Sequence, residues 1–291
     1  MLNGVIIKAY NSFYYVQTAD NVVSCKLRGR FKKERFSLLV GDRVEYEVVG
    51  AGKGIIENIL PRRSMLRRPM IANIDQVILT FAAVSPNISR ILVDRFLVLA
   101  EMSELDIILC INKIDLADSF EVQNIVEHYR TIGYQVIAIS AKAGIGIDIL
   151  RSKLQGKISV FAGPSGAGKS TILNNVETGL TLVTGELSEK IGRGKHTTRF
   201  AQLLPLSGGG FVVDTPGFSF TEFNDLTPNE LMHCFPEISE RVSGCKFSTC
   251  VHWREPQCAV KKAVADGQID EQRYQTYLAI LEEINLNKKR F

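Results

Sequence analysis

The spacing of hydrophobic residues predicts short β-strands over the first 60 residues. Apolar and polar positions alternate there in runs of five to eight residues, as in strands with one buried face. Turn-forming Asn, Asp and Gly residues separate the runs. We expect strands at residues 4–10, 13–18, 22–28, 42–49 and 54–59. Five short strands at this spacing predict a small barrel of the OB type, the five-stranded barrel that often binds oligonucleotides.

From residue 74 the pattern changes, because strongly apolar runs now alternate with longer segments of helical periodicity. Strands are predicted at residues 74–84, 106–111, 134–139 and 158–162, with helices near 89–103, 120–131 and 147–154. Such alternation is typical of an α/β domain with a parallel sheet. The basic stretch 61–69, which contains Pro61 and Pro69, is interpreted as the linker in front of it.

After about residue 223 the strand signals fade. Helices predicted at 228–234, 259–265 and 270–284 flank a cysteine-rich loop. The chain is therefore predicted to have three domains: an OB-type barrel (1–64), an α/β domain (65–222) and a mostly helical domain (223–291).

Composition narrows the cellular setting. The chain has 291 residues, of which 45% are hydrophobic and 23% charged, with six cysteines and a net charge of +4. The N-terminus lacks the pattern of a secretory signal, and no apolar run is long enough to span a bilayer. We expect a cytoplasmic protein whose cysteines are thiols or metal ligands. At so small a net charge, nucleic-acid affinity must come from local basic clusters.

One run matches the phosphate-binding loop, in which backbone N–H groups surround phosphates at a helix N-terminus. It follows the predicted strand 158–162 and precedes a helical segment. Lys169 is expected to reach the outer phosphates and Ser170 to ligate Mg²⁺. A plain glycine-rich turn is the alternative. The run consists of Gly163, Pro164, Ser165, Gly166, Ala167, Gly168, Lys169, Ser170 and Thr171.

A second motif predicts that the base is guanine. Asn112, Lys113 and Asp115 follow the predicted strand 106–111. The Asp115 carboxylate can accept from guanine N1–H and the 2-amino group, which adenine does not present there. Asn112 is expected at the opposite edge of the base, with the Lys113 stem along the ring. Alone, this motif is also a plausible helix N-cap.

Two further segments complete the predicted nucleotide site. The next strand leads into Ser140, Ala141 and Lys142, which can offer N–H groups to the guanine oxygen. Asp214 follows a short apolar strand and can hold Mg²⁺ through water, while the Gly217 N–H senses the terminal phosphate. A plain turn would explain the last motif by itself. Four matches, each at a strand end, instead predict a protein that binds and hydrolyses GTP.

The cysteine-rich loop predicts a structural zinc site. Four soft or borderline ligands fall within fourteen positions, which suits tetrahedral Cys₃His coordination. Such a site has no open position for water, so we expect it to stabilise the loop. Reduced cysteines that only pack are the alternative. The predicted ligands are Cys245, Cys250, His252 and Cys258.

A basic stretch on the predicted barrel is a candidate RNA contact. It runs from the third strand into the following loop, near the usual oligonucleotide face of an OB barrel. A solvated charged loop is the alternative. The residues are Lys26, Arg28, Arg30, Lys32, Lys33 and Arg35.

The nucleotide motifs occur in circularly permuted order, since the base-reading motifs precede the phosphate loop. With a barrel in front and a Cys/His cluster behind, the chain resembles the RsgA family of small ribosomal subunit biogenesis GTPases, also called YjeQ or YloQ. The resemblance implies a monomeric GTPase that binds rRNA in late maturation of the small subunit and is stimulated by it. It also assigns a Mg²⁺ ligand to Thr198, in a run (192–198) that is similar to the family's first switch.

The residue that orients the attacking water is predicted less directly than the residues that bind the nucleotide. Many GTPases have a water-orienting glutamine at the position of Phe218. We expect His196 to take that role, and turnover to be slow until a partner orders this loop. The alternative for His196 is a solvated loop histidine. The alternative function, which Phe218 leaves open, is an RNA-binding scaffold whose nucleotide site turns over negligibly.

Overall fold

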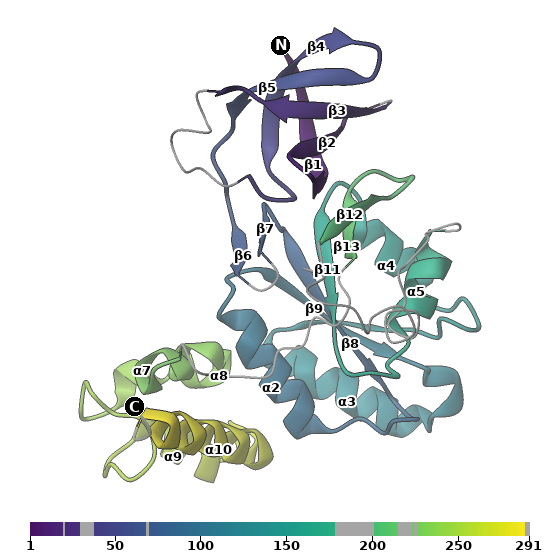
Figure 1. The fold of residues 1–291 in the computed structure, drawn as a ribbon. Coiled ribbons are helices and arrows are strands. Elements are labelled where there is room, and N and C mark those ends of the chain that lie inside the picture. Colours follow the sequence, from purple (N-terminus) through teal and green to yellow (C-terminus); the bar gives the residue numbers. More distant parts are fainter. Residues whose placement is uncertain are drawn as a thin grey trace, which may run out of the picture. The chain divides into compact units, whose positions relative to one another are not determined.

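The computed structural model describes residues 1–19, 21–29, 38–67, 70–177, 201–214, 223 and 226–288 (Figure 1). Its contacts divide the chain into two compact units. The first, here the barrel unit, comprises Met1–Ile78, Ala141–Ala162 and Lys169–Phe218. The second, here the C-terminal unit, comprises Leu79–Ser140, Gly163–Gly168 and Ser219–Phe291.

The N-terminal strands form the predicted barrel. It closes in the order β1-β2-β3-β5-β4, with β3 and β5 parallel and the other neighbours antiparallel. Its buried interior includes Ile6, Val16, Cys25, Val44, Tyr46 and Ile56. The strands are β1 (Leu2–Tyr10), β2 (Phe13–Gln17), β3 (Val22–Leu27), β4 (Arg43–Gly50) and β5 (Lys53–Ile59).

The stretch interpreted as a linker is structured. The short strand β6 (Met65–Arg67) lies within it and pairs with β7 (Met70–Ala72), which follows directly. Arg62 donates to both carboxylate oxygens of the fully buried Asp42, from Nε over 2.7 Å and from Nη2 over 2.8 Å. Asn73 Nδ2 donates to the Gly41 carbonyl over 2.9 Å. These bonds hold the stretch against the barrel, so it is a packed connection.

The central sheet has the order β10-β9-β8-β11-β13-β12. β9 and β10 are parallel, as are β11 and β13, whereas the edge strand β12 is antiparallel to β13. The pattern did not predict β12, a four-residue strand in which only Leu203 is buried. The strands are β8 (Gln76–Ala82), β9 (Asp106–Asn112), β10 (Gln135–Ala138), β11 (Ile158–Ala162), β12 (Gln202–Pro205) and β13 (Phe211–Asp214).

The helices of this region begin at residues that favour helix starts. Ser89 caps α2 (Arg90–Glu101) and Asp118 caps α3 (Ser119–Ile132), each through its side-chain oxygen. The 3₁₀ helix η1 (Ile114–Leu116), α4 (Ile147–Leu154) and α5 (Lys169–Val176) complete the set that is described here.

The C-terminal helices share a hydrophobic core with α2. Val98 and Leu99 of α2 belong to the same buried cluster as Phe235, Tyr277 and Ile280. None of the helices in the described ranges has the length and apolar character needed to cross a membrane. The elements are α7 (Pro228–Leu231), η2 (Met232–Cys234), α8 (Pro236–Ser239), η3 (Val242–Gly244), α9 (Ala259–Ala265) and α10 (Glu271–Lys288).

Candidate nucleotide site and metal centre

The phosphate loop starts where the fully buried strand β11 ends. Its first residue, Gly163, has φ +140°, and a Cβ there would lie 2.0 Å from the carbonyl oxygen of Thr80 on β8. The main chain of β8 cannot shift far enough to accommodate such an atom. The close approach of two main chains therefore requires glycine at this position.

Asn112 connects the base-reading motif to the phosphate loop. It ends β9 and is only 2% exposed, and its Nδ2 donates to the carbonyl of Ala167 over 2.9 Å. A Cβ on Gly168, whose φ is +92°, would lie 2.3 Å from that nitrogen. The sequence-based expectation assigned Asn112 to an edge of the base. The structure shows that its amide nitrogen holds the loop through a contact between residues 55 positions apart.

Lys113 adopts a left-handed conformation, with φ 61°, directly before η1. A non-glycine residue in this region costs roughly 1 kcal/mol, and such residues are frequent at functional sites. The Lys113 ammonium donates to the carbonyl of Ser85. A Cβ on Gly166 would lie 3.3 Å from Cδ of Pro86, so the same segment borders the phosphate loop. No motif in the sequence pointed to Ser85 or Pro86.

Asp115 is open to a ligand. Its carboxylate is exposed on η1 and has no partner among the described residues. The end of the neighbouring strand β10 lies next to the end of β9, because the Ile139 N–H donates to the Ile111 carbonyl over 2.8 Å. Ser140, which follows, is fully buried. The Asp115 carboxylate is therefore available for the guanine contact that the sequence predicts.

The start of α5 carries the predicted phosphate and Mg²⁺ groups. Lys169 is half-buried, and this burial lowers the pKa of its ammonium group. A bound phosphate would offset that desolvation through its negative charge. Ser170 and Thr171 are exposed in the first turn of α5. Asp214 ends β13, whose Val213 is opposite Val160 of β11.

Several predicted site residues lie outside the described residues. In the nucleotide site these are His196, Thr198 and Gly217, and Phe218 lies there as well. In the basic stretch they are Arg30, Lys32, Lys33 and Arg35.

The two described members of the basic stretch differ in their contacts. Lys26 is exposed, and its Nζ lies 5.1 Å from the centroid of the Phe13 ring. Arg28 is also exposed but forms an ion pair with the buried Glu57. Part of the Arg28 charge is thus compensated within the barrel, which leaves Lys26 as the freer of the two.

The four predicted zinc ligands lie together in the C-terminal unit. Their ligand atoms are all within 4.8 Å of one another. His252 Nδ1 lies 3.5, 3.4 and 3.4 Å from the sulfurs of Cys245, Cys250 and Cys258, and the sulfurs of Cys245 and Cys258 are 3.8 Å apart. Tetrahedral zinc with Zn–S of about 2.3 Å and Zn–N of about 2.0 Å needs S···N of about 3.5 Å and S···S of about 3.8 Å. The cluster fits a zinc ion.

The surroundings of the cluster explain why a metal would matter. Burial raises the pKa of the Cys250 thiol to about 12, so a cation is needed to hold the thiolate at neutral pH. Tyr274 OH on α10 donates to the His252 carbonyl over 2.6 Å, and Tyr277 OH donates to the Val251 carbonyl over 2.8 Å. Glu255, which the sequence did not single out, accepts from the Val251 N–H over 2.9 Å.

Comparison with known proteins assigns the chain to a family. Residues 59–224 match the family model described as RsgA GTPase, and residues 3–56 match the RsgA N-terminal domain. The chain belongs to the RsgA GTPase family. Membership confirms the predicted resemblance and makes the protein a GTP hydrolase.

Whole-length relatives agree with this assignment. The chain is 45% identical to the small ribosomal subunit biogenesis GTPase RsgA of Caldanaerobacter subterraneus subsp. tengcongensis, covering 99% of this chain and 98% of that one. It is 46% identical to the protein of the same name from Clostridium botulinum, covering 97% of each.

Solved structures support the predicted architecture. The crystal structure of YjeQ from Thermotoga maritima superposes with a TM-score of 0.85 at 41% identity, covering 97% of this chain and 98% of that chain. The structure of YloQ, described as a circularly permuted GTPase, has a TM-score of 0.85 at 39% identity, covering 100% and 96%. The barrel, the permuted GTPase domain and the helical Cys₃His region are thus confirmed as predicted.

Proposed function

We propose that this GTPase acts in late maturation of the small ribosomal subunit in the cytoplasm, as a monomer that binds the subunit and its rRNA. The relatives named as small ribosomal subunit biogenesis GTPases support this role, since they match over nearly the whole chain. Hydrolysis of GTP to GDP and phosphate, stimulated by the subunit, then releases the protein.

The contact of Asn112 with Ala167, beside the open carboxylate of Asp115, is the observation that carries the nucleotide assignment. Asp115 reads guanine, and Lys113 lies along the base. The strand end at Ser140, Ala141 and Lys142 offers N–H groups to the guanine oxygen. Gly163 to Thr171 hold the phosphates, with Lys169 at the outer ones.

Mg²⁺, the run 192–198 and the segment 214–217 contribute the groups that hydrolysis needs. Ser170 and Thr198 would ligate the ion, Asp214 would help to hold it, and Gly217 would respond to the terminal phosphate. His196 orients the attacking water. When bound, Mg²⁺ neutralises the charge that develops on the phosphate oxygens.

The proposed RNA and zinc sites lie on different parts of the chain. The basic stretch Lys26, Arg28, Arg30, Lys32, Lys33 and Arg35 contacts rRNA phosphates through the barrel. Within it, Lys26 is the strongest described contributor because Arg28 is paired with Glu57. One zinc ion on Cys245, Cys250, His252 and Cys258 stabilises the C-terminal loop.

Phosphate release measured with and without purified small subunits tests the proposal. We expect slow turnover by the protein alone and an increase of at least tenfold with small subunits, while large subunits serve as the control. His196→Ala should lose the stimulated rate and keep its GDP affinity. Equal rates with small and large subunits would refute the ribosomal role. An undiminished stimulated rate in His196→Ala would remove only this residue from the mechanism.

Asp115→Asn tests the base assignment in the same assay. The amide cannot accept both guanine donors but can donate to the 2-oxygen of xanthine. Turnover of GTP should fall and that of XTP should rise. If the variant retains its preference for GTP, Asp115 does not read the base.

A further inference from the structure

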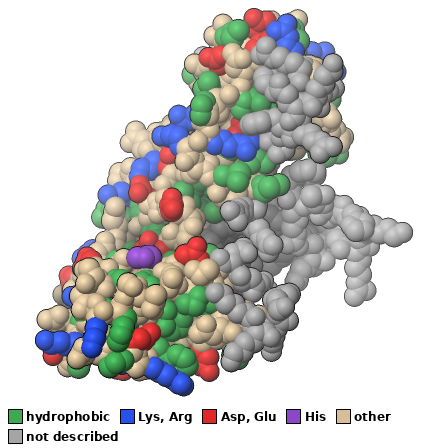
Figure 2. Space-filling view, turned by 90° about the vertical axis from the view of Figure 1, so that its left-hand side faces the viewer, with side chains coloured by type: hydrophobic (Ala, Val, Ile, Leu, Met, Phe, Trp, Pro, Cys, Tyr) green, Lys and Arg blue, Asp and Glu red, His purple; other side chains and the backbone are tan. Residues whose placement is uncertain are grey.

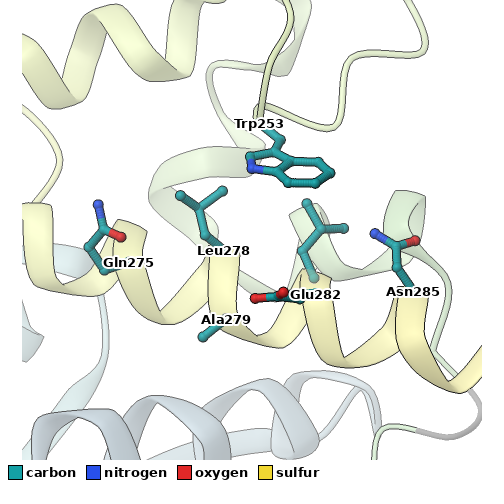
Figure 3. Close-up of a pocket in the computed structure, with 7 residues that line it drawn as sticks. Trp253, Gln275, Leu278, Ala279, Glu282 and Asn285 are labelled. Atoms are coloured by element: carbon teal, nitrogen blue, oxygen red, sulfur yellow. The ribbon is translucent and has the colours of Figure 1, made fainter.

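The loop that carries the Cys₃His cluster presents an exposed tryptophan over α10. Trp253 is the single tryptophan of the chain and is 44% exposed. Figure 3 shows its indole above Leu278, with Gln275, Glu282 and Asn285 projecting beside it from the same helix. Together they line a groove of about 300 Å³. It is separate from every residue assigned above to GTP or zinc binding.

The main chain that carries the indole is held in place without a ligand. The Trp253 backbone N–H donates to Glu255 over 2.9 Å, and the preceding residue, His252, belongs to the metal cluster. Tyr274 of α10 fixes the His252 carbonyl. A loop that is fixed beforehand loses less entropy on binding than a free one. The aromatic ring is therefore presented from a fixed main chain.

The surroundings of the indole are basic. The Arg254 guanidinium lies 4.0 Å from the Trp253 ring centroid, and Lys246 lies 5.7 Å from the exposed ring of Phe247. Residues 245–262 hold Lys246, Arg254, Lys261 and Lys262 and one acidic residue, Glu255. The Glu255 carboxylate already accepts backbone N–H groups of Val251 and Trp253. Exposed aromatic rings beside cationic groups are the combination that binds single-stranded nucleic acid.

The groove itself is lined by other groups than the basic residues that surround the tryptophan. Glu282 is exposed, and its carboxylate has no partner among the described residues, while Asn285 supplies an amide that can donate and accept. A carboxylate repels phosphate but accepts from the amino groups of bases. Figure 2 shows acidic, basic and apolar side chains interspersed on the face that it displays.

We propose that the Trp253 groove binds one unpaired base of an RNA strand, stacked on the face of the indole that Arg254 does not cover, with the adjacent phosphates on Arg254 and Lys246. The proposal rests on the ribosomal function above, which supplies the RNA. Because Glu282 accepts hydrogen bonds, bases with an exocyclic amino group, such as adenine and cytosine, bind better than uracil, whose base offers only N3–H as a donor.

The single tryptophan makes the test specific for this site. Emission of Trp253 is recorded while octamers of adenosine, cytidine or uridine ribonucleotides are added to the full-length zinc-loaded protein. We expect saturable quenching, with adenosine and cytidine octamers binding more tightly than uridine octamers. Binding to the barrel does not register, because the barrel contains no tryptophan.

Paired variants identify the groups involved. Arg254→Gln should weaken the octamer by about five- to tenfold, and Glu282→Gln should reduce the difference between cytidine and uridine octamers. Arg130→Gln on α3 and Glu240→Gln, both exposed and outside the groove, are the matched controls. Zinc content and circular dichroism confirm that each variant is folded. Unchanged emission with all three octamers, or equal effects of controls and groove variants, would overturn the proposal.

GTP hydrolysis and Trp253 emission, both measured with small subunits or their components, distinguish failure of the base site from failure of the ribosomal function. If subunits stimulate GTP hydrolysis but octamers leave Trp253 emission unchanged, the ribosomal function stands and the base site is wrong. If emission responds to RNA-free small-subunit proteins and not to octamers, the groove binds protein and the RNA proposal is refuted. If octamers quench Trp253 but subunits do not stimulate hydrolysis, the base site stands and the ribosomal function fails.

Discussion

Arg273 of α10 donates through Nη1 to the carboxylate of Asp94 on α2 over 2.7 Å, and both side chains are almost fully buried. The same guanidinium pairs with Glu237 and lies 4.8 Å from the ring of Phe235. With the hydrophobic core that α2 and α10 share, this network joins the C-terminal helices to the helix that follows β8. We therefore expect the helical domain and α2 to move as one body in any nucleotide-dependent change.

Arg273→Met should lower the free energy of unfolding by about 3–5 kcal/mol, because it leaves the buried carboxylate of Asp94 and the partly buried one of Glu237 without their cation. Urea denaturation followed by circular dichroism measures this. Arg95→Met is the control, since the Arg95–Glu283 pair is about one-third exposed and should contribute less than about 1 kcal/mol. Equal losses in the two variants would contradict the importance of the buried network.

Asn112→Ala should weaken GDP binding by about 5- to 150-fold, because the buried carbonyl of Ala167 loses its donor at a cost of about 1–3 kcal/mol. A fluorescent GDP analogue reports the affinity. Asn58→Ala, which removes a partly exposed amide on the barrel, should leave the affinity unchanged. Wild-type affinity in Asn112→Ala would show that the phosphate loop keeps its shape without this bond.

Gly163→Ala should abolish nucleotide binding and destabilise the protein, since its Cβ would overlap the Thr80 carbonyl. Gly156 offers a matched comparison, because it also has a positive φ, +70°, but no atom lies within 4 Å of its added Cβ. We expect Gly156→Ala to cost about 1 kcal/mol and Gly163→Ala about 1–3 kcal/mol more. Similar midpoints in thermal unfolding would show that the two backbones can separate.

Removal of zinc should unfold the loop that carries Cys245, Cys250, His252 and Cys258 and expose Trp253 further. The loop has little apolar interior of its own, so coordination contributes much of its folding energy. Treatment with a strong chelator should shift Trp253 emission to longer wavelength, and added Zn²⁺ should restore it. Cys25→Ser, on the barrel, should retain one zinc per chain, whereas Cys250→Ser should lose it. Unchanged emission after verified zinc removal would contradict the structural role.

His128 should make stability depend on pH. Burial lowers the pKa of this imidazole, an effect that Arg90 and Arg273 increase and that Asp270 and Asp94 oppose. The unfolded chain therefore takes up the proton first as the pH falls through about 6.5, and this contribution reduces stability on acidification. His128→Gln should thus lose less stability than the wild type between pH 8 and pH 6 in urea denaturation. A parallel pH dependence in both proteins would contradict this assignment.

Much of the architecture is predictable because its signals are local. The alternation of apolar residues located the five barrel strands, and the helical periodicity located α2, α3 and α4 within a few residues. The cysteine and histidine spacing identified the metal cluster, whose four members do converge. The edge strand β12 was missed because four residues with one buried side chain carry too little pattern.

The sequence by itself determined which chemical groups are present and which strand or helix end carries each of them, since propensities, turns and motifs act over a few residues. Tertiary structure alone decided which groups meet. Asn112 bonds to Ala167 across 55 positions, Arg28 pairs with Glu57 across 29, and Arg273 reaches Asp94 across 179. Contacts at such separations depend on how buried surfaces pack and leave no periodic trace in the chain.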